Sequence, residues 1–358
     1  MTTALGMPAT ASEIGPRRGA GPRPRVPGLV DTYGRVATDL RISLLDRCNL
    51  RCTYCMPEEG LDFLQSDELL SFDELVRLAR VAVTRLGVTK IRLTGGEPLL
   101  RPELTDLVAA LSRLEPRPQL ALTTNGIGLK SRAAKLRAAG LDRLNISLDT
   151  VHADTFARMT RRPFLRQVMA GIDAALDSGF ASIKINAVLL RGVNDTEAVD
   201  LVEWALDRGV ELRFIENMPL GGDRDWQRAE LVTAGEIRSR IRERYEVVAD
   251  AAPRDGAPAE RYRVLDGGRE LGSIGIIASV TEPFCEDCKR TRLTSEGRVR
   301  SCLFSDDETD LAGPMRAGAS DDGLAELWRG AMWRKPAGSG LWAPDFRQPE
   351  RSMSAIGG

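Results

Sequence analysis

The stretch that decides the fold is Arg41-Ile-Ser-Leu-Leu-Asp-Arg-Cys48-Asn-Leu-Arg-Cys52-Thr-Tyr-Cys55. It begins with a short β-rich run, which predicts a strand, and continues directly into a CxxxCxxC element. A loop that leaves a strand can wrap three thiolates around three corners of an iron–sulfur cube, so that one iron stays open to an exogenous ligand. Tyr54 is placed to cover such a cluster or a stacked ring. We therefore expect a [4Fe–4S] cluster on this loop.

Beyond this element, β-rich runs alternate with amphipathic stretches. Strands are predicted over 41–45, 90–94, 119–123, 143–148, 182–189 and 211–216, and helices over 72–86, 102–114, 131–139, 165–178 and 197–208. Ser71 and Glu74 form a capping box at the first helix, and Gly87 follows its last turn. Repeated βα units predict a parallel sheet with helices outside. Because neighbouring strands are sequential, we expect an α/β fold, a partial (β/α)₆ barrel of the TIM type with a smaller C-terminal domain, rather than a doubly wound sheet.

Three regions follow from these patterns. Residues 1–37 are rich in proline, glycine and arginine, which predicts a disordered N-terminal extension. Residues 38–230 contain the alternating units and are expected to form the partial barrel. After residue 219 the alternation stops, and 231–358 is predicted to be a C-terminal domain with a helix over 233–245, short strands over 246–280 and helical sequence near 321–333.

Composition excludes several classes of protein. The chain has 358 residues, 42% of them hydrophobic, with 50 Lys and Arg against 51 Asp and Glu. A net charge of −1 gives no general case for nucleic acid or an anionic membrane. No apolar run approaches the roughly 18 residues of a spanning helix, and no secretory signal is apparent. We expect a cytoplasmic protein that binds neither nucleic acid nor membrane.

A second group of cysteines, Cys285, Cys288 and Cys302, forms a CxxCx₁₃C element. Five basic side chains and one acid lie between Cys288 and Cys302, and arginine forks suit a polyanion such as a triphosphate. A zinc ribbon is one interpretation, but it requires a fourth ligand, and His152 is the only histidine. The other interpretation is a second three-cysteine cluster whose open iron binds substrate. Inward-facing Arg41, Arg92 and Lys184 would add to an anion site or form internal salt bridges.

The chain resembles the radical S-adenosylmethionine (SAM) superfamily. The resemblance rests on CxxxCxxC, on the Thr94-Gly-Gly-Glu-Pro98 element, and on Thr123-Thr-Asn-Gly126, Ser147-Leu-Asp149 and Glu216-Asn-Met218 at strand ends. In that superfamily the open iron binds the amino and carboxylate groups of SAM, and reductive cleavage yields a 5′-deoxyadenosyl radical. The resemblance implies a SAM site at the carboxyl ends of the strands.

Within that superfamily the chain is similar to the GTP 3′,8-cyclase family of molybdenum cofactor biosynthesis. The similarity runs from Arg41 to Gly358 and includes both cysteine elements and the final Gly-Gly pair. It implies two [4Fe–4S] clusters, on Cys48, Cys52 and Cys55 and on Cys285, Cys288 and Cys302. The implied SAM contacts are Tyr54, Gly96, Ser147 and Met218. The implied GTP contacts are Arg41, Arg92, Thr123, Lys184, Arg290, Thr291 and Arg292, and Gly357 and Gly358 are implied to reach the catalytic site.

This similarity implies that the radical removes the ribose C3′ hydrogen of GTP and that the sugar radical adds to guanine C8. The implied partners are GTP, an electron donor such as flavodoxin or ferredoxin, and cyclic pyranopterin monophosphate synthase as the recipient of the product. The protein would act as a monomer or a homodimer. Two alternatives stay open at this stage: a radical SAM peptide maturase with an auxiliary cluster, and a zinc-binding module.

Overall fold

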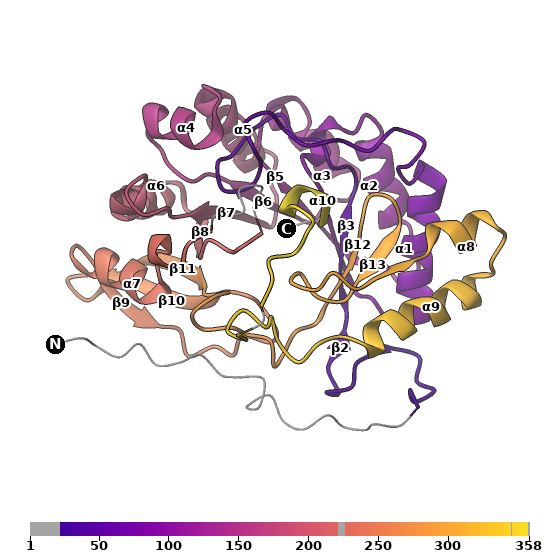
Figure 1. Ribbon diagram of the computed structural model, residues 1–358. Helices are drawn as coiled ribbons and strands as arrows, with labels where there is room; N and C mark the ends of the chain where they lie inside the picture. Colours follow the sequence, from indigo (N-terminus) through magenta and orange to yellow (C-terminus); the bar gives the residue numbers. More distant parts are fainter. Residues whose placement is uncertain (1–21, 221–225, 345, 357–358) are drawn as a thin grey trace.

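A curved sheet of twelve strands forms the centre of the computed structural model, which describes residues 22–220, 226–344 and 346–356 (Figure 1). The strand order is β14-β13-β12-β3-β4-β5-β6-β7-β8-β11-β10-β9. The central parallel strands are β3 (Asp39–Ser43), β4 (Lys90–Thr94), β5 (Gln119–Thr124), β6 (Arg143–Ser147), β7 (Ser182–Val188) and β8 (Glu211–Ile215). They neighbour one another in chain order, as a (β/α)₆ partial barrel requires, and the expected fold class is confirmed.

The C-terminal half adds a strand to each edge of this barrel. β12 (Arg290–Leu293) pairs parallel with β3, and β11 (Arg269–Ile277) pairs parallel with β8. Antiparallel strands continue the sheet outward on both sides: β13 (Arg298–Arg300) and β14 (Glu308–Asp310) beyond β12, and β10 (Glu260–Asp266) and β9 (Glu246–Ala249) beyond β11. The barrel therefore stays open on the side between β11 and β12.

Helices cover the outside of the barrel (Figure 1). They are α1 (Phe72–Leu86), α2 (Leu104–Ser112), α3 (Ala133–Ala138), α4 (Ala153–Thr160), α5 (Leu165–Asp177), α6 (Ala198–Arg208), α7 (Ala234–Arg242), α8 (Ala312–Arg316) and α9 (Asp321–Trp333). The last helix, α10 (Met353–Ile356), lies in the middle of the molecule instead. The bounds of α1 match the prediction because local signals set them: Ser71 and Glu74 form the capping box, and Gly87 ends the helix at φ 71°. No helix in the described ranges combines the length and the apolar character that a membrane span needs.

The first strand begins two residues earlier than its sequence predicts. Thr38 and Asp39 donate backbone hydrogen bonds to the carbonyl of Lys289, and β3 pairs with β12 from Asp39 onward. The partner that extends β3 lies about 250 residues along the chain, so no local pattern could report it. Helix α4 was not expected either, and it begins on His152 without a side-chain cap.

The N-terminal region differs from the expected disordered extension over 1–37. Residues 1–21 lie outside the described residues, but β1 (Leu29–Val30) pairs antiparallel with β2 (Val36–Ala37). Leu29 is fully buried, and β1 packs against α9. Buried Arg35 binds Asp31 through Nε and donates to the carbonyl of Cys285 at 2.8 Å. A proline- and arginine-rich segment is thus ordered by contacts that it makes with the C-terminal half.

Candidate active site

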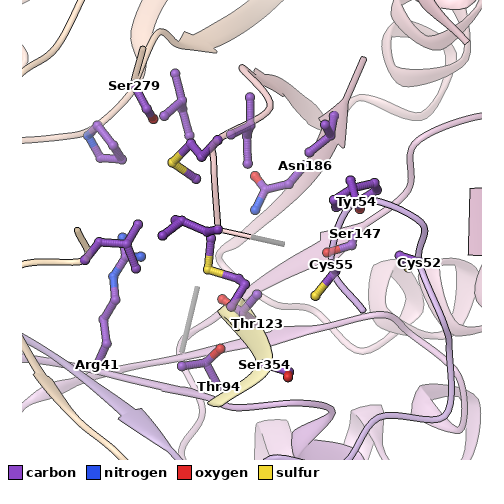
Figure 2. A pocket seen from close by; sticks show the side chains of 18 of the residues that line it. Arg41, Cys52, Tyr54, Cys55, Thr94, Thr123, Ser147, Asn186, Ser279 and Ser354 are labelled. Atoms are coloured by element: carbon purple, nitrogen blue, oxygen red, sulfur yellow. The ribbon is translucent and has the colours of Figure 1, made fainter. Parts of the chain in front are cut away.

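A cavity of about 340 Å³ lies at the carboxyl ends of the parallel strands, where sites gather in barrels of this kind. All six cysteines line it. Of the other residues expected in the site, Arg41, Tyr54, Arg92, Gly96, Thr123, Ser147, Met218, Arg290 and Arg292 also line it. Figure 2 shows Cys52, Cys55, Tyr54 and Ser147 on one side of the space and Arg41 on the other. One cavity thus joins two sequence elements that are more than 200 residues apart.

The first cysteine loop follows β3 and folds back on itself. The amide of Cys55 donates to the carbonyl of Cys52 at 2.9 Å. Tyr54 donates its hydroxyl to Asp149 at 2.8 Å, and Asp149 also accepts from the amide of Val188. Burial raises the pKa of Cys55 to about 12 and that of Asp149 to about 6. A buried thiol of this kind becomes a thiolate only when a metal compensates its charge.

The glycines after β4 allow two backbones to meet. A Cβ on Gly95 would lie 2.4 Å from the carbonyl oxygen of Leu45, and one on Gly96 would lie 2.0 Å from that of Arg47. The amide of Gly96 donates to Leu45 at 2.7 Å. Glycine is therefore required here because this loop packs directly on the first cysteine loop, an intramolecular reason beyond the ligand approach that the pattern suggests.

Glu97 ties the same loop to the end of β5. Its fully buried carboxylate accepts from the amides of Leu99 and Asn125, at 2.9 and 2.7 Å, and from the hydroxyl of Thr124. Burial raises the pKa of Glu97 to about 7, although the hydrogen bonds from Asn125, Leu99 and Thr124 oppose the increase.

The second cysteine loop connects the two strands, β11 and β12, that border the open side of the barrel. Cys285 and Cys288 lie between β11 and β12, and Cys302 follows β13. Burial alone would raise the pKa of Cys288, but the Lys335 ammonium and the Arg290 guanidinium lower it to about 6. Burial raises the pKa of Cys285 to about 11. Cys288 is thus stabilised as a thiolate by the protein itself.

Five arginines line the cavity: Arg41, Arg92, Arg213, Arg290 and Arg292. Burial, followed by repulsion from Arg290, lowers the pKa of Arg41 to about 10; burial and repulsion from Arg41 lower that of Arg92 to about 9. The Nε atoms of Arg41 and Arg92 are buried and lack a hydrogen-bond partner within the described parts of the chain. Such a group of buried cations is stabilised by an anion.

The carboxylates on the cavity wall, those of Glu97, Asp149 and Glu216, do not neutralise these arginines, because each is held by the protein's own donors. Glu216 is fully buried and accepts from the amides of Ala234 and Val280, each at 2.8 Å, and from Thr281. Arg213 is paired with Glu211 at 2.6 Å, so the buried Nε atoms of Arg41 and Arg92 are the donors on this wall that lack a partner within the described residues.

Two residues expected in the substrate site lie elsewhere. Thr291 faces away from the cavity, because side chains alternate along β12 between Arg290 and Arg292, and its hydroxyl accepts from Trp328 at 2.9 Å. Lys184 is not among the lining residues, and its ammonium binds Glu211 at 2.9 Å, which is the internal salt bridge considered as its alternative.

Other lining residues were given no individual role from the sequence, although Asn125 and Asp149 belong to the motifs at the strand ends. Among them are Asn125, Asp149, Asn186, Arg213, Met353 and Ser354. The alternation of β7 and β8 carried a usable signal, since Asn186 shares a face with Lys184 and Arg213 shares one with Glu211. Met353 and Ser354 carried none, because their position depends on how the C-terminal segment folds back.

The C-terminal segment returns to the cavity through α10, shown in yellow near the end of the chain in Figure 1. Ser354 lies beside the first cysteine loop in Figure 2, and Met353 donates its amide to the carbonyl of Leu220 at 3.1 Å. Arg351 binds Glu296 at 2.5 Å and Glu308 at 2.8 Å. Gly357 and Gly358 lie outside the described residues, directly after this segment.

The residues present fit two iron–sulfur clusters. All six cysteines are free thiols, and they line one cavity as two trios. In the described ranges, no three His, Cys, Asp or Glu side chains are grouped for a single metal ion. Thiolates alone, three to a trio, are the donor set of an iron–sulfur cluster with an open iron. The donors therefore match the clusters expected from the sequence.

Comparison with known proteins agrees with this geometry. The radical SAM superfamily profile matches residues 42–205, and the profile described as Molybdenum Cofactor Synthesis C matches 210–341. The chain is 56% identical to a GTP 3′,8-cyclase of Paenarthrobacter nicotinovorans, over 92% of this chain and 97% of the relative. It is also 56% identical to a protein of the same name from Streptomyces coelicolor, over 92% of this chain and 96% of that one.

A solved structure shares the fold at low identity. SuiB of Streptococcus suis superposes with a TM-score of 0.54 at 14% identity, covering 86% of this chain and 68% of SuiB.

Proposed function

The chain belongs to the GTP 3′,8-cyclase family, and from that premise we propose that it converts GTP into (8S)-3′,8-cyclo-7,8-dihydroguanosine 5′-triphosphate, the first step of molybdenum cofactor biosynthesis. One observation carries the proposal for these residues: a single cavity joins both cysteine trios and five arginines. An enzyme that makes a radical at one metal centre and holds a purine triphosphate at another needs this arrangement.

The first trio, Cys48, Cys52 and Cys55, holds the cluster that binds SAM. When bound, this cluster and SAM supply the 5′-deoxyadenosyl radical, which takes the C3′ hydrogen of the substrate. Tyr54, Gly96, Ser147 and Met218 surround SAM, and all four line the cavity beside the trio. Tyr54 is fixed by its hydrogen bond to Asp149, so the loop is ordered before SAM arrives.

The second trio, Cys285, Cys288 and Cys302, would hold the second cluster, whose open iron would bind the guanine. Arg41, Arg92, Arg290 and Arg292 bind the triphosphate, since guanidinium groups pair with phosphate oxygens through two parallel hydrogen bonds. Thr123 contacts the nucleotide from the end of β5. Lys184 and Thr291 support the site indirectly, the first through Glu211 and the second through Trp328.

The C-terminal segment covers the reacting atoms. Met353 and Ser354 already line the cavity, and Gly357 and Gly358 continue from them, where two residues without side chains can enter a crowded space. Exclusion of water by this segment would protect the radical from side reactions.

The reaction can be tested under anaerobic conditions. Protein reconstituted with iron and sulfide, then given SAM, GTP and dithionite, is expected to form 5′-deoxyadenosine and the cyclised nucleotide. ATP replaces GTP as a matched control and should support neither product. Equal SAM cleavage without any nucleotide would contradict the proposal. Iron analysis separates the zinc alternative, since two cubanes contain roughly eight iron and eight sulfide per chain.

The partners of the protein follow from the chemistry of the proposed reaction. Reductive cleavage of SAM requires a one-electron donor, and a flavodoxin or ferredoxin suits it. The product is a reactive nucleotide, and direct transfer to cyclic pyranopterin monophosphate synthase would protect it. A monomer or a homodimer would act in the cytoplasm.

A further inference from the structure

Lys335 lies beside a ligand of the second trio. It follows α9 directly, and only 4% of its surface is exposed. Its ammonium donates to Cys288 Sγ at 3.2 Å, to the carbonyl oxygen of Arg290 at 2.7 Å and to that of Cys288 at 3.4 Å. No motif in the sequence gives a reason to select this lysine, since its contact with Cys288 spans 47 residues.

Among the described residues, no carboxylate balances this ammonium. In the described parts of the chain, Lys184 pairs with Glu211 and Lys289 pairs with Asp255, but Lys335 forms no ion pair with any acid. A buried cation without a counter-ion costs free energy. The nearest negative charge that can compensate it is the thiolate of Cys288, together with whatever metal centre that thiolate holds.

Two anchors fix the position of Lys335. On its N-terminal side, Trp328 of α9 donates to Thr291 of β12 at 2.9 Å. On its C-terminal side, Arg35 donates to the carbonyl oxygens of Pro336 and Ala337, at 2.5 and 2.6 Å. The lysine is therefore held from both sides before any cluster binds, and its side chain does not have to be ordered at that moment.

We propose that Lys335 sets the reduction potential of the second iron–sulfur cluster through its hydrogen bond to the sulfur of Cys288. The inference rests on the proposed function, because it requires a cluster on Cys285, Cys288 and Cys302. A positive charge and a hydrogen bond at a ligand sulfur favour the reduced form, which carries more negative charge. Lys335 is thus a positioning and tuning residue that acts through a ligand.

The test compares three variants of the full-length reconstituted protein. Lys335→Met removes the cation, and Lys335→Arg keeps a cation and a donor. Lys289→Met is the matched control, since this lysine is adjacent to Cys288 in sequence but its ammonium turns to Asp255 at 2.8 Å. Redox titrations followed by electron paramagnetic resonance report each cluster, and the signal that stays unchanged when SAM is added belongs to the second one.

For Lys335→Met we expect the one-electron reduction of the second cluster to become at least about tenfold less favourable, a shift of about 59 mV to lower potential. In Lys335→Arg and Lys289→Met, the midpoint potential of the second cluster should stay near that of the parent protein. Loss of about half the iron from Lys335→Met alone would overturn the tuning role, because the lysine would then be needed to retain the cluster rather than to set its potential.

Other outcomes distinguish a failure of the proposed role of Lys335 from a failure of the proposed function. An unchanged midpoint potential in Lys335→Met, with the iron of both clusters retained, would overturn the role of Lys335 and leave the proposed function intact. Iron loss in both Lys335 variants would also overturn the role of Lys335, since the positive charge that Lys335→Arg keeps would then not explain the effect. A parent protein with only about four iron would overturn the second cluster itself, and with it the inference.

Discussion

Arg41 contributes to ligand binding more than to folding. Its guanidinium is buried beside the cationic Arg290, and its Nε has no partner in the described residues. Arg41→Met should therefore weaken GTP binding by about 10- to 100-fold, the range for a charge-assisted hydrogen bond, without lowering the melting temperature of the apoprotein. Calorimetric titration with GTP checks the first effect and thermal unfolding checks the second. Arg113→Met, at an exposed position, is the control, and unchanged GTP affinity in Arg41→Met would contradict the assignment.

Glu97 makes stability depend on pH in an unusual direction. Because its pKa is raised to about 7 in the folded protein, its contribution to stability is complete below about pH 4.5 and is lost as the pH rises through 7. Between those values the free energy of unfolding of the cluster-free protein should fall by up to about 3 kcal/mol more than that of Glu97→Gln.

Urea unfolding of both proteins at several pH values measures this difference. If the free energy of unfolding depends on pH in the same way for the parent protein and for Glu97→Gln, the Glu97 carboxyl group does not cause the pH dependence.

At the scale of elements, an ion-pair cluster fastens the C-terminal segment over the cavity. Arg351 joins Glu296, in the turn between β12 and β13, to Glu308 of β14. Arg351→Met should expose the end of the chain to carboxypeptidase about tenfold more, which corresponds to about 1.4 kcal/mol of lost docking free energy.

Glu296→Gln should act in the same direction, and Arg347→Met, an exposed position in the same segment, is the control. Equal rates of digestion for Arg351→Met and Arg347→Met would mean that the ion pairs do not hold the segment.

At the scale of the whole molecule, the predicted boundary at 230/231 divides a continuous sheet. β8 pairs with β11 and β3 pairs with β12, and both of these partners come from the second region. A fragment that ends at residue 230 would also leave buried Glu216 without Ala234, Val280 and Thr281 as donors. We expect this fragment to show no cooperative unfolding in urea, because an unpaired buried acid and two exposed strand edges destabilise it.

Circular dichroism during urea unfolding would show this, with the full chain as reference. A fragment that unfolds cooperatively at the same urea midpoint would establish that the two regions are independent domains.

The sequence by itself determined the elements of the barrel, the two thiol trios and the family. These features depend on signals between residues that are close in the sequence. A capping box sets the start of α1, and the alternation of β-rich and amphipathic runs indicates where the strands lie. Cys48, Cys52 and Cys55 lie within eight residues, so a single loop holds all three.

Only the tertiary structure decided which cations face the cavity, that β11 and β12 extend the barrel at its edges, and that Lys335 reaches Cys288. Each of these depends on contacts between segments tens to hundreds of residues apart. The free energy of such contacts comes from packing and burial, which leave no periodic trace in the local sequence.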